Sequence, residues 1–194
     1  YLLGPRGRLA SLAIDMFESK SVDFQAIKTK DAFYLSKINQ NDVVINFTGR
    51  GVRAEDRNIS KEEIWEINYE LTKHLGEICF QNRVRLIHFS SELEFDPSLV
   101  NDYVKSKRAA TELLLQLSIN GLDSCILSLP SVVGFENRPG HVDWVFQNIF
   151  HYNGMQRDKK ALLIKRPVLH SRTFIGLLEW LISYPLNFDG VTKI

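Results

Sequence analysis

The chain has 194 residues, ordinary apolar and charged fractions, and a formal net charge of +1. A chain of this length can bury one sizeable core. Basic residues are scattered among acidic ones, so we expect no charged surface for nucleic acid or for an anionic membrane. We also expect neither a signal peptide nor a membrane-spanning segment, because no apolar run is long enough to cross a bilayer.

Cysteine usage indicates the compartment. Cys79 and Cys125 both lie in apolar stretches and provide neither a disulfide framework nor a cluster of metal ligands. The five histidines are scattered and do not change this. We therefore predict a reduced, cytoplasmic protein with no bound metal.

The first residues predict a short strand, a glycine turn and a helix. Apolar residues precede Gly4 and Gly7, and from Leu9 to Phe17 they recur at helical spacing. Glycines allow close approach, and the start of a helix presents N–H groups and a positive end to a pyrophosphate. The turn is therefore a candidate phosphate site, although such turns are also common without a ligand. The strand is unusually short, so we expect that the natural start is missing.

Two further strands follow. The second is predicted from 22 to 27, and its end carries Lys28, where dinucleotide folds usually place an acidic residue for the ribose. A lysine there favours the 2′-phosphate of NADP, unless it is a simple surface charge. The third strand, 42–47, leads into Thr48 and Gly49, at the edge where open α/β sheets bind ligands. The short connection between these strands predicts an abbreviated crossover.

A capping box and a long apolar stripe predict a helix from 60 to about 82. Asn68 lies near that stripe, where it either faces solvent or is held for a specific hydrogen bond. The next apolar run, 85–89, predicts a buried strand. It leads directly into two hydroxyls, Ser90 and Ser91.

The next predicted helix starts at Asn101 or Asp102 and stops at the Asn-Gly pair that ends at residue 121. Tyr103 and Lys107 are four residues apart and so share one helix face. A nearby cation favours phenolate and brings the pKa of a phenol from about 10 toward neutral pH, where it can exchange protons. Most tyrosine–lysine pairs at this spacing are only an aromatic residue at the edge of the core and a solvated lysine. The order of the other elements is therefore needed to decide whether this pair is catalytic.

A last buried strand is predicted over 125–129, followed by Pro130 and small residues. The repeated alternation of strand and helix predicts an α/β fold, a doubly wound parallel sheet of Rossmann-like type, with right-handed crossovers.

The order of these features resembles the extended short-chain dehydrogenase/reductase family, the NAD(P)-dependent epimerases, dehydratases and ketoreductases of nucleotide sugars. The resemblance covers nearly the whole chain. It implies an NAD(P)-binding Rossmann-like domain over 1–134 and a small C-terminal substrate-binding lobe over 135–194, interleaved with the main domain. In the lobe we expect a helical stripe over 144–150, a short strand over 161–164 and a helix over 174–182.

The resemblance also implies a role for each matching residue. Tyr103 would be the general acid/base toward a sugar hydroxyl or carbonyl. Lys107 would hold the nicotinamide ribose and lower the pKa of the tyrosine, and Ser91, or failing that Ser90, would hydrogen-bond the reacting oxygen. Asn68 matches a helix asparagine with a partly structural role. The implied cofactor contacts are Gly4, Gly7, Ala10, Thr48, Gly49, Lys107 and the 129–131 segment that contains Pro130.

Arg172 resembles a family arginine that approaches the nucleotide phosphates, and a guanidinium fork suits a diphosphate. Its alternative role is a surface charge at a helix start. The chain also departs from the family pattern. Ser91 and Tyr103 are only twelve positions apart, about half the spacing that the resemblance implies, the acidic ribose residue is absent, and Thr173 stands where the family has an aspartate. The lobe also ends early, at Ile194.

The predicted function is that of an NAD(P)-dependent oxidoreductase or epimerase. Its substrate would be a nucleotide-linked sugar, changed by 4-keto reduction or epimerisation in surface polysaccharide or nucleotide-sugar biosynthesis. The cofactor would be NADP or NAD, and a homodimer would pair through the helices at 61–82 and 102–119. One alternative is a non-catalytic dinucleotide-binding sensor or interaction protein. Another is an enzyme on a non-sugar carbonyl, which would use Tyr103 and Lys107 but not Arg172.

Overall fold

A computed structural model gives the structure of the chain and describes residues 1–35, 38–51, 58–134, 167–183 and 191–193. Its main sheet has the spatial order β2-β1-β3-β4-β5-β8, and every neighbouring pair is parallel. A second parallel pair joins β6 and β7. The strands are β1 (Leu2–Leu3), β2 (Ala26–Ile27), β3 (Val43–Asn46), β4 (Arg85–Ser91), β5 (Ser124–Leu129), β6 (Ser131–Val133), β7 (Val168–His170) and β8 (Val191–Lys193).

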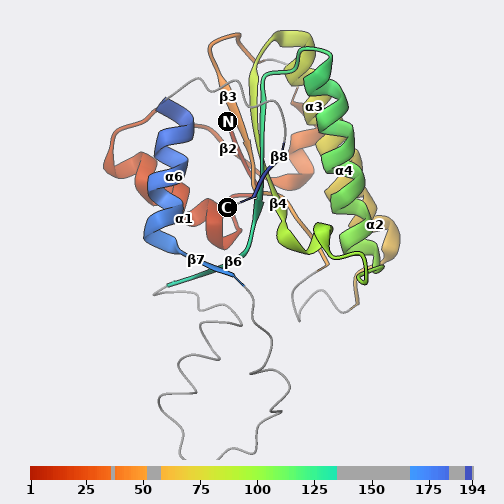
Figure 1. Ribbon diagram of the computed structural model, residues 1–194. Helices are drawn as coiled ribbons and strands as arrows, with labels where there is room; N and C mark the ends of the chain where they lie inside the picture. The colour runs from red at the N-terminus through yellow and green to blue at the C-terminus, as the bar shows by residue number, and fades with distance from the viewer. Residues whose placement is uncertain (36–37, 52–57, 135–166, 184–190, 194) are drawn as a thin grey trace, which may run out of the picture.

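Helices cover both faces of the main sheet (Figure 1). One face carries α1 (Arg8–Ser19) and α6 (Ser171–Ser183), and the other carries α2 (Lys61–Trp65), α3 (Leu71–Asn82) and α4 (Asp102–Ile119). This confirms the predicted doubly wound, Rossmann-like α/β fold. Because β2 and β3 lie on opposite sides of β1, the strand order reverses there, and sheets of this type bind ligands at that point.

Single turns of other helix types connect these elements. The crossover between β2 and β3 holds a 3-10 helix, η1 (Thr29–Tyr34), as the short connection predicted. A π-helical turn, η3 (Glu66–Glu70), joins α2 to α3, and a 3-10 turn, η4 (Glu92–Phe95), follows β4. The prediction of one regular helix over 60–82 missed the π-helical turn.

Two strand boundaries differ from the prediction. The strand predicted over 22–27 is wrong in its first part, because the Val22 N–H closes the end of α1 on the Phe17 carbonyl at 2.9 Å, after Ser21 adopts a left-handed conformation. β4 continues through Ser90 and Ser91, where the prediction ended the strand before them. Both serines therefore have the fixed, alternating directions of strand residues.

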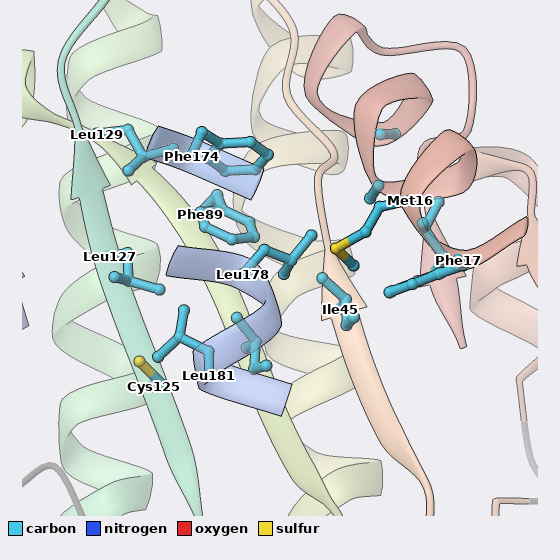
Figure 2. Close-up of a cluster of buried hydrophobic side chains, with 14 of the residues drawn as sticks. Met16, Phe17, Ile45, Phe89, Cys125, Leu127, Leu129, Phe174, Leu178 and Leu181 are labelled. Atoms are coloured by element: carbon cyan, nitrogen blue, oxygen red, sulfur yellow. The ribbon is translucent and has the colours of Figure 1, made fainter. Parts of the chain in front are cut away.

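The core lies in two parts, one on each face of the sheet. Between the sheet and α1 and α6, the rings of Phe47 and Phe89 stack with centroids 4.7 Å apart, and Phe174 of α6 meets Phe89 edge-on at 5.4 Å. Figure 2 shows this cluster, with Leu178 of α6 among its members. Between the sheet and α3 and α4, the buried residues include Val44, Leu75, Leu86, Leu114 and Ile126.

The division into domains at residue 134 stays a prediction. The helical stripe over 144–150 and the strand over 161–164 lie outside the described residues. The described part of the second segment belongs to the main architecture, since α6 packs on the sheet and β8 pairs with β5. Within the described ranges, no helix combines the length and apolarity that a membrane span needs.

We expect Phe174→Ala to lower the free energy of unfolding by about 3–5 kcal/mol, because it removes a fully buried ring from a packed cluster. Tyr34→Ala is the matched control, since the Tyr34 side chain is 83% exposed and its truncation should cost little. Urea denaturation measures both. Equal losses in the two variants would contradict the packing of α6 described above.

Candidate functional site

The glycine turn has the conformation that a phosphate site needs. Gly4 adopts a φ of +76°, and the Gly7 N–H donates to the Gly4 carbonyl at 2.9 Å. Helix α1 begins directly after Gly7, with no side-chain cap and no acidic residue in its first turn. No carboxylate of this first turn therefore competes for its N–H groups, and the helix end favours an anion.

The segment after β3 joins this turn to the next part of the site. A Cβ at Gly4 would lie 3.3 Å from Cγ2 of Thr48, so the two segments are in contact. Thr48 is buried and fixed by Asn46, whose Oδ1 accepts from the Thr48 N–H at 3.0 Å and from its hydroxyl at 2.6 Å. Gly49 is exposed, and a Cβ there would lie 3.6 Å from Nζ of Lys107.

Asn68 makes the specific hydrogen bonds that the sequence left as one of two alternatives. Its Oδ1 accepts from the Arg50 N–H at 2.9 Å, and its Nδ2 donates to the Arg50 carbonyl at 3.0 Å and to the Ser106 hydroxyl at 3.0 Å. The side chain is fully buried within the π-helical turn η3. It thus fixes the loop after β3 against α4, next to the candidate catalytic pair.

Lys107 lies inside the protein, with 3% of its surface exposed. Its Nζ donates to the carbonyls of Thr48 and Phe89, both at 3.2 Å. Burial lowers the pKa of Lys107 to about 8, and the charge of Glu94 opposes that shift. The ammonium therefore belongs to the protein interior and is not a solvated surface charge.

Tyr103 differs from the sequence-based expectation. Its pKa is raised, first by burial and then by the charge of Glu94, while a hydrogen bond with the Ser91 side chain lowers it in part. The expectation that Lys107 would lower this pKa is wrong for the chain by itself, because the ammonium donates to backbone carbonyls and desolvation of the phenol dominates. The hydroxyl of Ser90, the alternative to Ser91, donates to Glu94.

Sequence reasoning missed Glu94. Its side chain is 4% exposed, and its Oε2 accepts from the Ser90 hydroxyl at 3.0 Å and from the Thr111 hydroxyl at 2.7 Å. Its Oε1 accepts from the Ser128 hydroxyl. Arg108 donates to the Glu94 backbone carbonyl at 2.7 and 2.9 Å, which fixes the turn η4 on α4. The sequence offered one signal that could have identified Glu94. Hydroxyl side chains lie on a helix and on a strand that were both predicted to be buried, with a glutamate near them in the chain.

Three predicted residues lie apart from this group. Lys28 is exposed after β2, Pro130 is buried after β5, and Arg172 is exposed in the first turn of α6. Figure 1 shows that α6 begins at the end of the molecule where α4 begins, so Arg172 lies at the site's end of the sheet. No described contact links these three side chains to Tyr103. Nor do three or more metal-ligating side chains gather anywhere within the described residues.

The order and geometry of these elements are those of an NAD-dependent enzyme of the extended short-chain dehydrogenase type. The chain belongs to the NAD dependent epimerase/dehydratase family, whose model matches residues 18–172. No curated protein matches the chain.

Solved structures share the fold at low identity, and each match covers 100% of this chain. One is UDP-glucuronic acid 4-epimerase from Bacillus cereus, crystallised with NAD, with a TM-score of 0.73, 16% identity and 76% of that chain covered. A second is the dTDP-glucose 4,6-dehydratase DesIV from Streptomyces venezuelae, with NAD bound, at 0.74, 13% and 74%. A third is L-threonine dehydrogenase from Phytophthora infestans, at 0.73, 16% and 75%.

We expect Asn68→Ala to lower the free energy of unfolding by about 1–3 kcal/mol, because it removes three hydrogen bonds made by a fully buried side chain. Asn82→Ala is the control, since it removes a single exposed bond to the Ile78 carbonyl from the same long helix. Chemical denaturation compares them. A loss no larger than that of the control would show that the Asn68 contacts do not fix the loop.

The pKa of Lys107 predicts a pH dependence of stability. In the folded chain the value is about 8, below its ordinary value of 10.5, so between these values the unfolded chain binds more protons. The free energy of unfolding should therefore rise with pH from about 8 toward 10. Lys107→Met should lack this rise. Urea denaturation at several pH values tests it, and parallel curves for the two proteins would contradict the assigned pKa.

Proposed function

We propose that the chain either reduces a 4-keto group of a nucleotide-linked sugar or epimerises such a sugar, with NAD(P) as cofactor and Tyr103 as the acid/base. The observation that carries the proposal is the group of Ser91, Tyr103 and Lys107, joined to the glycine turn through Thr48 and Gly49. A phosphate cradle and a proton-transfer group are thereby connected along one edge of the sheet.

The residues present fit a dinucleotide. The Gly4–Gly7 turn and the uncapped start of α1 would hold the pyrophosphate, Thr48 and Gly49 would line the adenosine side of the cleft, and Pro130 would meet the nicotinamide. Bound NAD(P) would accept or donate the hydride. We propose that Lys28 favours the 2′-phosphate of NADP. The Bacillus cereus and Streptomyces venezuelae proteins were crystallised with NAD, so the preference needs direct measurement.

The protonated form of Tyr103 is the one that would act in the reductive direction. A phenol whose pKa is raised is protonated at neutral pH and can donate its proton to a carbonyl oxygen as that oxygen gains charge. The Ser91 hydroxyl, which already contacts the phenol, would hold the same oxygen. The Lys107 ammonium would hold the nicotinamide ribose from below the loop at Gly49.

We propose that Arg172 binds the diphosphate of the substrate, which makes the nucleotide part of the substrate class. The similar structures include enzymes named for UDP-linked and dTDP-linked sugars. They also include L-threonine dehydrogenase, which favours a second candidate function, oxidation or reduction of a small non-sugar substrate. That second function would keep Tyr103 and Lys107 but would not need Arg172.

We further propose a cytoplasmic enzyme of surface polysaccharide or nucleotide-sugar biosynthesis that forms a homodimer through α3 and α4. Buried free thiols at Cys79 and Cys125 support a reducing compartment. The exposed apolar side chains of Phe80 and Ile119, at the ends of those two helices, support the pairing.

We expect Tyr103→Phe to retain the affinity for NADH and NADPH, because it removes only a hydroxyl, and to lower turnover of a 4-keto nucleotide sugar by about 100-fold or more. Lys107→Ala should weaken cofactor binding as well. Calorimetric titration measures the binding, and loss of cofactor absorbance measures the turnover. Lys105→Ala, an exposed lysine on the same helix, is the control and should change neither.

The outcomes separate the candidates. If the chain binds neither cofactor, the oxidoreductase proposal is wrong, and the glycine turn is only a turn. Binding without turnover of any carbonyl substrate would favour the non-catalytic sensor. Arg172→Ala should bind UDP more weakly than the wild type does. An unchanged UDP affinity would favour the non-sugar substrate.

A further inference from the structure

A buried polar layer lies between the sheet and α3 and α4, above the apolar core on that face. The register pairs Asn46 with His88 and Ser90 with Ser128, so polar side chains occupy the carboxyl ends of three adjacent strands. Asn46 Nδ2 lies 3.1 Å from Nδ1 of His88 and donates to Thr72 of α3 at 3.3 Å. Every one of these side chains is buried. The layer therefore needs internal partners for all its polar atoms.

Glu94 is the acidic member of this layer. Hydroxyls from β4, α4 and β5 donate to its carboxylate, from Ser90, Thr111 and Ser128 respectively. Three hydroxyl donors satisfy a carboxylate that is 4% exposed, and an ionised carboxylate is the form that only accepts hydrogen bonds. The donor set therefore suits a charged glutamate in the interior.

The same contacts place this carboxylate beside Lys107. Thr111, which donates to it, lies four residues beyond Lys107 on α4 and therefore on the same helix face. Ser90, which also donates to it, directly follows Phe89, whose carbonyl accepts from the Lys107 Nζ. Two donors to Glu94 thus come from positions next to Lys107 on its helix or next to one of its acceptors on β4.

Few other charged groups face Lys107 within the described residues. His88 of β4 is buried, and its pKa lies well below the ordinary value through burial and then the charge of Lys107, so it is neutral. Tyr103 is protonated, and Arg108 donates to the Glu94 backbone carbonyl. The β3 segment contributes the carbonyl of Thr48, and η3 contributes the amide of Asn68 near Gly49. Among the described residues, Glu94 is the negative charge that acts on Lys107.

We propose that Glu94 is a positioning residue that supplies the buried counter-charge for Lys107 and so keeps its ammonium protonated at neutral pH. It acts through Lys107 and does not itself touch cofactor or substrate. The inference rests on the proposed role of Lys107 as the cofactor-holding ammonium. Its test measures the charge of that lysine directly and therefore does not depend on turnover.

The experiment follows the Lys107 Cε signal by NMR in ¹³C-lysine-labelled protein as a function of pH, with Lys107→Arg identifying the signal. In the wild type we expect a midpoint near the pKa of about 8. In Glu94→Gln, which keeps the size and loses the charge, we expect the midpoint to fall by about one pH unit or more. Glu94→Asp keeps the charge and should lie closer to the wild type.

Glu112→Gln is the matched control, since it removes one exposed carboxylate from α4, the helix that carries Lys107, and should leave the midpoint unchanged. A midpoint unchanged in Glu94→Gln, or shifted equally in the control, would overturn the proposal. If Glu94→Gln does not fold, the wild-type midpoint decides, because a buried lysine without a counter-charge titrates at about 5–6. A wild-type value below about 7 would then overturn the proposal, and a higher value would support it. NADH titration of the wild type separately tests the proposed function.

Discussion

The structure depends on the burial of one ammonium, that of Lys107, beneath the loop that follows β3. An unpaired lysine charge in a protein interior costs several kcal/mol, so it persists only where acceptors surround it. Here the acceptors are the carbonyls of Thr48 and Phe89, at the ends of two adjacent strands. The carboxylate of Glu94 adds the opposite charge. The parallel register of β3 and β4 is what places both carbonyls within reach of one side chain.

This constraint explains why the side chains on one face of the sheet change from apolar to polar along the strands. Near their starts the strands contribute Val44, Leu86 and Ile126 to an apolar core under α3 and α4. Toward their carboxyl ends the same face carries His88 and Ser128, which are polar. Side chains there partner one another in part, as Asn46 does with His88, while Nε2 of His88 is buried without a partner among the described residues. The opposite face, under α1 and α6, stays apolar to the level of Phe89 and Leu129.

The sequence predicted those features that depend on contacts between residues close together in the chain. The Ser60 hydroxyl caps its helix on the Glu63 N–H, and Asn101 caps α4 on the Val104 N–H, as their residue types indicate. The π-helical turn at Asn68 was not predictable in this way, because its hydrogen bonds go to Arg50 and Ser106, which are far along the chain. Glu94 was missed for the same reason, since its three hydroxyl donors come from three separate elements.

Tyr103 shows how the same limit affects chemistry as well as fold. Helical spacing alone places a lysine one turn away and suggests a lowered phenol pKa, because only the pair is considered. In the folded chain the lysine charge is already directed to backbone carbonyls and balanced by Glu94, which also acts on the phenol. Desolvation then decides the direction, and the phenol remains protonated. The protonation state of the phenol therefore follows from the burial and the charges around the pair and not from the pair itself.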